Sequence, residues 1–361
     1  MGDNDRMRIG IDTRLAGPGL GIARFISQLS RRLVSSPGVE VVWFGDPSLA
    51  PDGVRSRYAV HRYPYPVLDS PVGRRWVARA GLDVFHFPAN TGWGRPGPVP
   101  VVLTVHDLIF CTTTIRNRGL RQVVGHRYAR RNAPLAARAA VRVASPSEAT
   151  AAEVSASFPG VRPEVIPNGV EAPPSAPAAP VEGSPYVVAF SGRDPRKGLD
   201  LALEGLRSMR SEPPYRLRVL AGAGLPDGFE ARAGAELASG RVEILDYLSR
   251  AEMWEVLRGG SALVYPSSAE GFGLPVIEAM SVGVPVISGL APATREIGGD
   301  ALLVIDPAAP AASIAETLDR LVQEPRLRER SVEAGISRAR EFTWERTASR
   351  YLDLYAEAAA S

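Results

Sequence analysis

The chain has 361 residues, of which 45% are hydrophobic and 22% are charged, a composition typical of a globular protein rather than a disordered one. At about 100–200 residues per domain, this length favours two domains. No apolar run reaches the ~18 residues that a membrane-spanning helix needs, the N-terminus does not resemble a signal peptide, and a single cysteine, Cys111, excludes an internal disulfide or a zinc site of several thiolates. Together these features indicate a cytoplasmic protein.

The net charge of +3 is unevenly distributed along the chain. Residues 1–170 carry a net charge of +10, whereas residues 171–361 carry −7. A basic half predicts an anionic partner for that half. Attraction between the two halves, or simple solvation of the charges, is the alternative explanation.

In the first half, apolar runs of strand length alternate with helical patterns. Residues 21–33 show the apolar repeat of an amphipathic helix. The short apolar runs lack alternation, which is typical of strands buried on both faces of a parallel sheet. The expected strands are 7–12, 39–45, 83–87, 99–108 and 141–146.

Residues 171–185 are rich in proline and alanine, have no periodicity and are typical of a linker. The pattern then restarts, and 342–360 forms a last amphipathic helix. Alternation on both sides of a linker predicts two doubly wound α/β domains, with ligands bound beyond the carboxyl ends of the strands. The expected strands of the second half are 186–192, 215–224, 242–248, 261–268 and 284–289, and its expected helices are 199–209, 249–260 and 274–283.

The first candidate loop is AGPGLGIARF, residues 16–25. Gly17, Gly19 and Gly21 would let the backbone approach a phosphate or sugar, and the helix that follows favours an anion at its N-terminus. The dinucleotide-binding fingerprint is incomplete, because Arg24 stands where a third glycine is expected. An ordinary strand–helix turn is the alternative.

The second candidate loop is FSGRDPRKG, residues 190–198, with Arg193 and Lys197 on either side of a short turn. Lys197 is the only lysine, since the other 41 of the 42 basic Lys and Arg residues are arginines. A planar guanidinium and a compact ammonium suit a diphosphate, and such cations can meet the charge of a leaving group without a metal. The alternative is a solvated basic turn without a ligand. A position of that kind would tolerate arginine, as the other basic positions of the chain do.

The third candidate is EGFGLPVIEAM, residues 270–280. Glu270 and Glu278 lie on either side of the predicted start of a helix, where Pro275 suits the first turn. The carboxylates could accept hydrogen bonds from sugar hydroxyls, and the outward-pointing amides at the helix start could donate to a phosphate. The alternative makes Glu278 a favourable helix-dipole charge and Glu270 a turn residue.

The fourth candidate is the pair His106–Asp107, which interrupts an apolar run at the end of an expected strand. We expect His106 to project into a ligand-binding cleft. His86 with Asn90 is a weaker candidate of the same kind. The alternative for both histidines is a buried imidazole with its hydrogen bonds satisfied.

The spacing Glu270-x7-Glu278 around GFGLP resembles the signature of retaining GT-B glycosyltransferases of family 4, the group 1 glycosyltransferases. GIARF resembles the N-terminal loop of mannosyltransferase-like members in particular. TVHDL, IPNGV, GRDPRKG, VLAGAG, GVPVIS and GGDALLVIDP occur in the family's order, so the resemblance covers nearly the whole chain.

The resemblance implies a GT-B fold, with two Rossmann-like doubly wound domains facing a central cleft. Residues 1–170 would form the acceptor-side domain, 171–185 the linker and 186–340 the donor-binding domain. Residues 341–361 would form a C-terminal helix that crosses back to the first domain.

The resemblance also implies roles for individual residues. Arg193 and Lys197 would bind the donor diphosphate, Glu278 the ribose, and Glu270 the transferred sugar. His106 would touch the sugar near the leaving group. The catalytic set is thus His106, Glu270, Lys197 and Arg193, and the donor-binding set is Gly19, Gly21, Arg193, Lys197, Phe272, Gly273, Leu274 and Glu278. The turn from Arg193 to Lys197 is about one residue shorter than the family pattern, and Arg196 is the alternative to Arg193.

The expected activity is a metal-independent, retaining transfer of a hexosyl unit from a nucleotide-diphosphate sugar to a hydroxyl acceptor. GDP-mannose is the first guess for the donor, and the acceptor would be a small molecule, a glycan or a lipid-linked glycan. The loop at 246–248 would meet the donor base. We expect no cofactor besides this donor substrate, and no nucleic acid. The alternatives are a relative that couples a non-sugar or pseudo-sugar unit, a dinucleotide-dependent oxidoreductase, and a non-catalytic binding protein.

Residues 116–131 combine six arginines with an apolar stripe of Leu120, Val123, Val124 and Tyr128. A basic amphipathic helix of this kind predicts a peripheral contact with an anionic membrane or a phosphorylated lipid acceptor. A helix packed on the domain with a solvated arginine face is the alternative.

Overall fold

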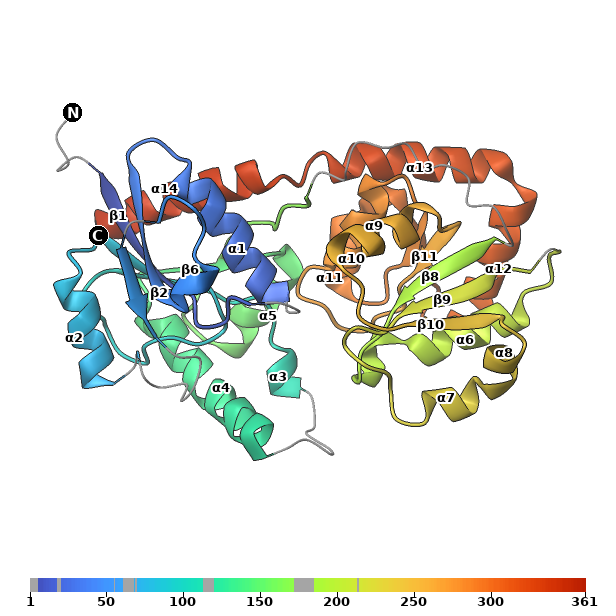
Figure 1. Cartoon of the computed structure of the whole chain (residues 1–361), viewed down its shortest axis with the longest axis horizontal. Coiled ribbons are helices and arrows are strands. Elements are labelled where there is room, and N and C mark those ends of the chain that lie inside the picture. The colour runs from blue at the N-terminus through green and yellow to red at the C-terminus, as the bar shows by residue number, and fades with distance from the viewer. Residues whose placement is uncertain are drawn as a thin grey trace. The chain divides into compact units, whose positions relative to one another are not determined.

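The computed structural model of the chain describes residues 6–17, 21–54, 56–60, 68, 70–112, 120–171, 185–212 and 214–361. They divide into two compact units, and each unit carries its own parallel sheet (Figure 1). The first unit is Met1–Gly169 with Thr343–Ser361, and the second is Val170–Phe342. Of the linker expected at 171–185, only Glu171 and Pro185 lie among the described residues.

The sheet of the first unit has the order β3-β2-β1-β4-β5-β6-β7, and every described pairing is parallel. The strands β4 and β5 are buried along their length, and β2 is buried after its first two residues, as the unbroken apolar runs predict. The strands are β1 Met7–Asp12, β2 Val39–Gly45, β3 Ser56–Ala59, β4 Val84–Phe87, β5 Val101–Thr104, β6 Arg142–Ser145 and β7 Glu164–Val165.

Helices cover both faces of this sheet (Figure 1). On one face, α1 Gly21–Val34 and the C-terminal α14 Trp344–Ala359 pack with their apolar stripes against the strands. The other face is covered by α2 Pro71–Arg79, α4 Leu120–Ala139 and α5 Glu148–Ser157. The described short helices of this unit are η1 Pro47–Leu49 and α3 Ile109–Thr112.

The sheet of the second unit has the order β10-β9-β8-β11-β12-β13, again parallel in every described pairing. One face packs against α6, α7 and α12, and the other against α9, α10, α11 and the end of α13. The strands are β8 Tyr186–Phe190, β9 Arg216–Leu220, β10 Val242–Leu245, β11 Ala262–Val264, β12 Val286–Ser288 and β13 Leu302–Val304. The helices are η3 Pro195–Lys197, α6 Leu199–Ser208, α7 Phe229–Arg232, α8 Gly234–Ala238, α9 Arg250–Arg258, α10 Leu274–Ser281, α11 Pro292–Gly298, η4 Gly299–Ala301, α12 Pro310–Gln323 and α13 Pro325–Ala339.

The first six strands of each sheet share one order, in which the first strand of the unit lies inside the sheet, between the second and the fourth. This is the doubly wound order in which the chain reverses its direction of winding. The reversal falls between β1 and β4 in the first unit, and between β8 and β11 in the second. Ligands bind doubly wound sheets at this reversal, beyond the carboxyl ends of the strands.

Several elements differ from the sequence-based expectation. The strand expected at 99–108 is limited to Val101–Thr104, because the chain then turns through His106 and Asp107 into α3. The helix expected within 116–131 runs from Leu120 to Ala139 and contains Pro134. The strands β3, β7 and β13 and the helices α2, α3, α5, α7, α8, α11, α12 and α13 have no counterpart among the elements predicted from the sequence.

Candidate active site

The Lys197 and Glu270 side chains meet at the carboxyl edge of the second sheet. Lys197 ends the short helix η3 that follows β8, and Glu270 lies in the loop that follows β11. Asp194 caps η3 by accepting a hydrogen bond from the Arg196 amide, and Gly198 ends it with a left-handed φ of 71°. Because β8 and β11 are neighbours, their loops meet, and Lys197 Nζ lies 2.6 Å from Glu270 Oε1.

Four donors converge on one oxygen of Glu270. Tyr265 Oη and Ser267 Oγ each donate to Oε1 at 2.7 Å, beside Lys197 at 2.6 Å and Arg196 at 3.0 Å. Burial opposes ionisation of Glu270, but the charges of Lys197 and Arg196 outweigh it and lower the pKa of the carboxyl. Glu270 is therefore a fixed carboxylate at the edge of the sheet.

Tyr265 connects the two charged groups, because its hydroxyl accepts from Lys197 Nζ at 2.7 Å and donates to Glu270. Burial and the neighbouring Glu270 charge raise the pKa of Tyr265 well above its usual value. The phenol therefore keeps its proton, and the hydrogen bond to Glu270 is preserved at any physiological pH.

Arg193 and Arg196 take different positions in the loop. Arg196 forms ion pairs with Asp194 at 3.1 Å and with Glu270 at 3.0 Å, so it shapes the loop from within. The Arg193 side chain lies against the backbone of Gly224, where an added Cβ would come within 3.0 Å of its Cγ and Nε. Of the two arginines, Arg193 is the one without an ion pair to a described residue.

Glu278 lies inside α10, and its side chain is only 3% exposed. The helix begins after Gly273, whose φ of 98° suits glycine, and an added Cβ there would lie 2.9 Å from Thr294 Cγ2. The Phe272 side chain is buried and packs edge-on against Phe342. The Glu278 carboxylate accepts from Arg250 Nη2 of α9 at 2.7 Å.

Tyr247 is the most exposed aromatic ring at this edge. It follows β10 and is 70% exposed. An added Cβ on Gly222, in the loop after β9, would lie 3.9 Å from Tyr247 Cα, so the loops after β9 and β10 lie next to each other. Tyr247 belongs to the segment 246–248 in which the sequence predicts the contact with the donor base.

In the first unit, His106 lies beside the start of α1. Its ring packs edge-on against Phe25 of α1, with the centroids 4.8 Å apart. The Pro88 carbonyl can only accept, so His106 Nε2 donates to it at 3.0 Å and Nδ1 keeps its lone pair. Burial lowers the pKa of His106 to about 4, so the imidazole is neutral near pH 7.

His86 has a structural role, as its alternative explanation predicts. It is fully buried, and its two ring nitrogens pair with Tyr355 Oη and Thr104 Oγ1, each at 2.8 Å. Burial and the nearby His106 lower its pKa to about 3. His86 therefore fastens α14 to the sheet, whereas Asn90 accepts from the His106 amide at 2.7 Å.

Of the glycine loop, Gly17 and Gly21 are described and Gly19 lies outside the described residues. Gly21 opens α1, and among the described residues outside its own helix turn no atom lies within 4 Å of the position that a Cβ would take there.

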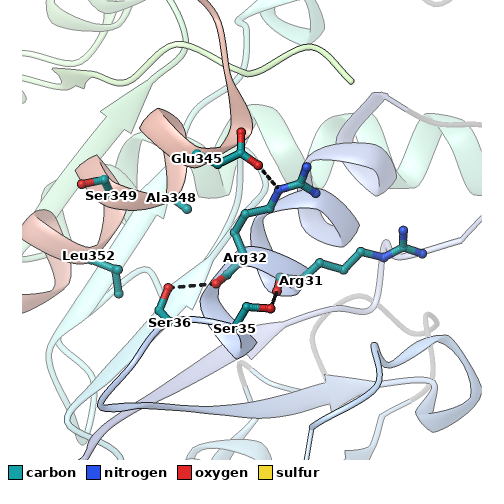
Figure 2. Close-up of a pocket in the computed structure, with 8 residues that line it drawn as sticks. All are labelled: Arg31, Arg32, Ser35, Ser36, Glu345, Ala348, Ser349 and Leu352. Carbon is teal, nitrogen blue, oxygen red and sulfur yellow. Dashed lines mark hydrogen bonds and ion pairs between the residues drawn. The ribbon is translucent and has the colours of Figure 1, made fainter. Parts of the chain in front are cut away.

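A separate surface pocket of about 450 Å³ lies at the other end of α1. Figure 2 shows Arg32 reaching across it to Glu345 of α14, an ion pair of 3.2 Å. The pocket contains none of the predicted site residues, and its ion pair connects α1 to the C-terminal helix. It is lined by Arg31, Arg32, Ser35, Ser36, Glu345, Ala348, Ser349 and Leu352.

The described residues contain neither a metal-binding cluster nor a membrane-spanning helix. No cluster of three or more His, Cys, Asp and Glu residues among them could hold a metal ion. None of the described helices is both long and apolar enough to cross a membrane.

Two known protein families match successive stretches of the chain. The family described as "Glycosyltransferase Family 4" matches residues 20–172, and the family described as "Glycosyl transferases group 1" matches residues 175–338. The chain belongs to the group 1 glycosyltransferases of family 4. The resemblance in the motifs is thereby confirmed, and the two matches together take in both units of this glycosyltransferase.

Solved structures confirm the GT-B fold of this glycosyltransferase. Sucrose-phosphate synthase from Thermosynechococcus elongatus superposes with a TM-score of 0.75 at 20% identity, over 99% of this chain and 100% of that one. Anabaena HepE in complex with UDP-glucose has a TM-score of 0.71 at 16% identity, over 98% of this chain and 100% of that one. At these identities the likeness concerns the fold alone.

Curated relatives match over shorter stretches. The phosphatidyl-myo-inositol mannosyltransferase of Mycobacterium tuberculosis is 30% identical over 207 residues, 54% of this chain and 54% of the relative. The chain spans 30% to 54% of the length of five curated relatives, and 77% of the phosphatidyl-myo-inositol mannosyltransferase of Mycobacterium leprae, to which it is 28% identical.

Sequence reasoning about this glycosyltransferase missed three residues that hold the predicted site together: Tyr265, Ser267 and Arg250. Tyr265 and Ser267 stand just before Glu270 in YPSSAEG, and a polar pair at the end of an apolar strand is a signal that could have found them. Arg250 gives no such signal, since it lies 28 positions before Glu278 in the sequence.

Proposed function

We propose that this glycosyltransferase moves a hexosyl unit from a nucleotide-diphosphate sugar to a hydroxyl acceptor, with retention of the anomeric configuration and without a metal. GDP-mannose is our first choice of donor. The observation that carries the proposal is the Lys197–Glu270 pair, 2.6 Å apart at the winding reversal of the second sheet. A cation for a diphosphate and a carboxylate for sugar hydroxyls stand together there.

In this proposal the donor lies along the carboxyl edge of the second sheet. Lys197 and Arg193 neutralise the diphosphate, and Glu270 accepts hydrogen bonds from the hydroxyls of the sugar. Glu278 accepts from the ribose, and the exposed ring of Tyr247 supports the base. The amides of Gly273 and Leu274, at the start of α10, donate to phosphate or sugar oxygens.

The first unit supplies the remaining contacts. Gly19 and Gly21 let the start of α1 approach the phosphates, and His106 touches the sugar near the leaving group. Because its pKa is lowered to about 4, His106 acts there as a neutral hydrogen-bond acceptor through Nδ1 and supplies no proton.

The proposed reaction is a same-face substitution. The acceptor oxygen forms a bond to the anomeric carbon while the bond between that carbon and the diphosphate oxygen breaks. The acceptor proton passes to the departing phosphate oxygen, so neither a protein base nor a metal-bound hydroxide is required. The enzyme contributes position and electrostatic stabilisation of the charge that develops on the diphosphate.

The donor base and sugar are open to direct test. A mannosyltransferase among the relatives favours GDP-mannose, whereas the UDP-glucose complex of HepE makes UDP-glucose the competitor. Thermal unfolding would be measured with GDP, UDP, dTDP, ADP and NADH, on the native protein and on Lys197→Ala. A ligand at hundredfold excess over its dissociation constant stabilises by about 2.7 kcal/mol.

We expect one nucleoside diphosphate to stabilise the native protein and the variant to lose that effect. Stabilisation by NADH alone would instead favour a dinucleotide-dependent oxidoreductase, and an unchanged effect in Lys197→Ala would remove the diphosphate role of this lysine. Retention is tested by the anomeric configuration of the product by NMR, and metal independence by transfer in excess EDTA.

The membrane contact of the acceptor side is part of the proposal. On α4, Val124 is 58% exposed and Leu135 is 46% exposed, and at eleven residues apart they share one face of the helix. Arg127 and Arg131 lie on that same side. Exposed apolar residues among arginines suit an anionic lipid surface. Co-sedimentation with anionic vesicles at low salt, lost in Val124→Glu, is the expected result, and its absence would favour a soluble acceptor.

A further inference from the structure

Glu278 depends for its charge partner on a residue of another helix. The side chain is 3% exposed, and a buried carboxylate is costly unless it is paired. The partner is Arg250, the first residue of α9, whose Nη2 donates to Glu278 Oε1 at 2.7 Å.

The Arg250 guanidinium has three partners. On the edge that donates to Glu278, its Nε also donates to Glu171, at 2.7 Å. Its central carbon lies 4.7 Å from the ring centre of Trp254, in cation–π contact. A planar group with two carboxylates and one ring around it has a fixed orientation, which a lysine ammonium could not adopt.

The backbone that carries Arg250 is fixed as well. Ser249 caps α9 by accepting from the Glu252 amide, and the Glu252 side chain accepts from the Ser249 amide, forming a complete capping box. Glu171 follows Val170, whose amide donates to the Phe342 carbonyl at 3.0 Å. Arg250 therefore ties Glu278 to the segment at which the chain enters the second unit.

We propose that Arg250 is a positioning residue that fixes the Glu278 carboxylate for the ribose diol of the donor nucleotide. The inference rests on the proposed function, in which Glu278 accepts from the ribose. Arg250 occupies one edge of the carboxylate, and this sets the direction in which the other lone pairs point. Arg250 does not touch the nucleotide, so its removal weakens ribose recognition through Glu278 alone.

The test compares the affinities of GDP and 2′,3′-dideoxy-GDP by calorimetry, or of the corresponding uridine pair if UDP binds more tightly. Each hydrogen bond to a charged acceptor contributes enough affinity that the native enzyme should prefer the ribonucleotide by about tenfold or more. Arg250→Met should reduce this preference to about threefold or less. Arg250→Lys keeps the positive charge but lacks the planar guanidinium. Its preference for the ribonucleotide should lie between those of the native enzyme and Arg250→Met.

Arg218→Met is the matched control. Arg218 also combines an ion pair, with Glu243 at 2.8 Å, and a cation–π contact, with Tyr186 at 4.0 Å. It lies on β9, outside the proposed site, and its loss should leave the ribose preference at the native value. Melting temperatures of all variants identify those that fold.

A double-mutant cycle separates positioning from direct contact. In a Glu278→Gln background, Arg250→Met should change neither GDP affinity nor the ribose preference further. An equal loss in both backgrounds would mean that Arg250 contacts the nucleotide itself, and an unchanged preference in Arg250→Met and Arg250→Lys would also overturn the proposal. If the native enzyme binds GDP and dideoxy-GDP equally, the ribose role of Glu278 fails first and this inference fails with it.

Discussion

Lys197 Nζ lies 2.6 Å from Glu270 Oε1 and 2.7 Å from Tyr265 Oη. A compact ammonium is thus packed between a carboxylate and a phenol, in a side chain that is only 20% exposed. Guanidinium is larger and planar, and the Arg196 guanidinium already contacts the same carboxylate oxygen at 3.0 Å. This gives a structural reason for the single lysine among 41 arginines.

Lys197→Arg is therefore expected to be severe, although it keeps the charge. The larger head group would displace Tyr265 or Glu270, and transfer should fall by about 100-fold or more, as for loss of one preorganised donor. The measurement is kcat/KM for sugar transfer, with Arg218→Lys as the matched control. Native activity in Lys197→Arg would show that only the charge matters at this position.

Tyr265→Phe removes one hydroxyl and leaves the ring in place. Lys197 loses an acceptor and Glu270 loses a donor, so both side chains become less fixed. We expect the free energy of unfolding to fall by about 0.5–1.5 kcal/mol, the typical contribution of one hydrogen bond. We expect kcat to fall as well, by a factor that corresponds to a larger change in activation free energy. Urea unfolding and steady-state kinetics measure the two separately. A variant that is destabilised but fully active would limit Tyr265 to a role in folding.

Acid should destabilise the first unit through its two buried histidines. The folded pKa values are about 3 for His86 and about 4 for His106, both below the unfolded value of 6.5. The unfolded chain then binds more protons than the folded one, so stability falls as the pH drops from about 6.5 toward 4. At pH 4 each histidine costs about 3 kcal/mol relative to pH 7.

Unfolding by urea at pH 7, 6 and 5 measures this dependence. His86→Gln removes one of the two titrating groups, so the stability difference between the native protein and the variant should shrink by about 2 kcal/mol from pH 7 to pH 5. A difference that stays constant over that range would contradict the neutral state of His86.

The sequence predicts the general position of the site because its motifs follow apolar strands. A loop after a buried parallel strand must leave at the carboxyl edge, and the sheet order places the loops after β8 and β11 side by side. Periodicity and motif order were thus sufficient to predict two doubly wound units and the neighbourhood of Lys197 and Glu270.

Contacts between elements that are distant in the sequence could not be predicted from it. His86 and His106 both stand near strand ends, yet His86 pairs with Tyr355, 269 residues away on α14. Arg250 reaches Glu278 only because α9 and α10 cover the same face of the second sheet. Such partners are set by tertiary packing, which local pattern does not encode.

The last prediction concerns the point where the chain leaves the first unit. An added Cβ on Gly169 would lie 2.2 Å from the Trp344 amide nitrogen and 2.6 Å from the Thr343 carbonyl carbon. Both neighbours are backbone, so neither can rotate away, and Gly169→Ala should destabilise by about 1–3 kcal/mol through overpacking. Gly234→Ala is the control, because no described atom outside its own helix turn lies within 4 Å of its added Cβ, and a helical alanine there should be neutral or slightly stabilising. Equal unfolding midpoints for the two variants would mean that the segments at Gly169 and Trp344 can separate without cost.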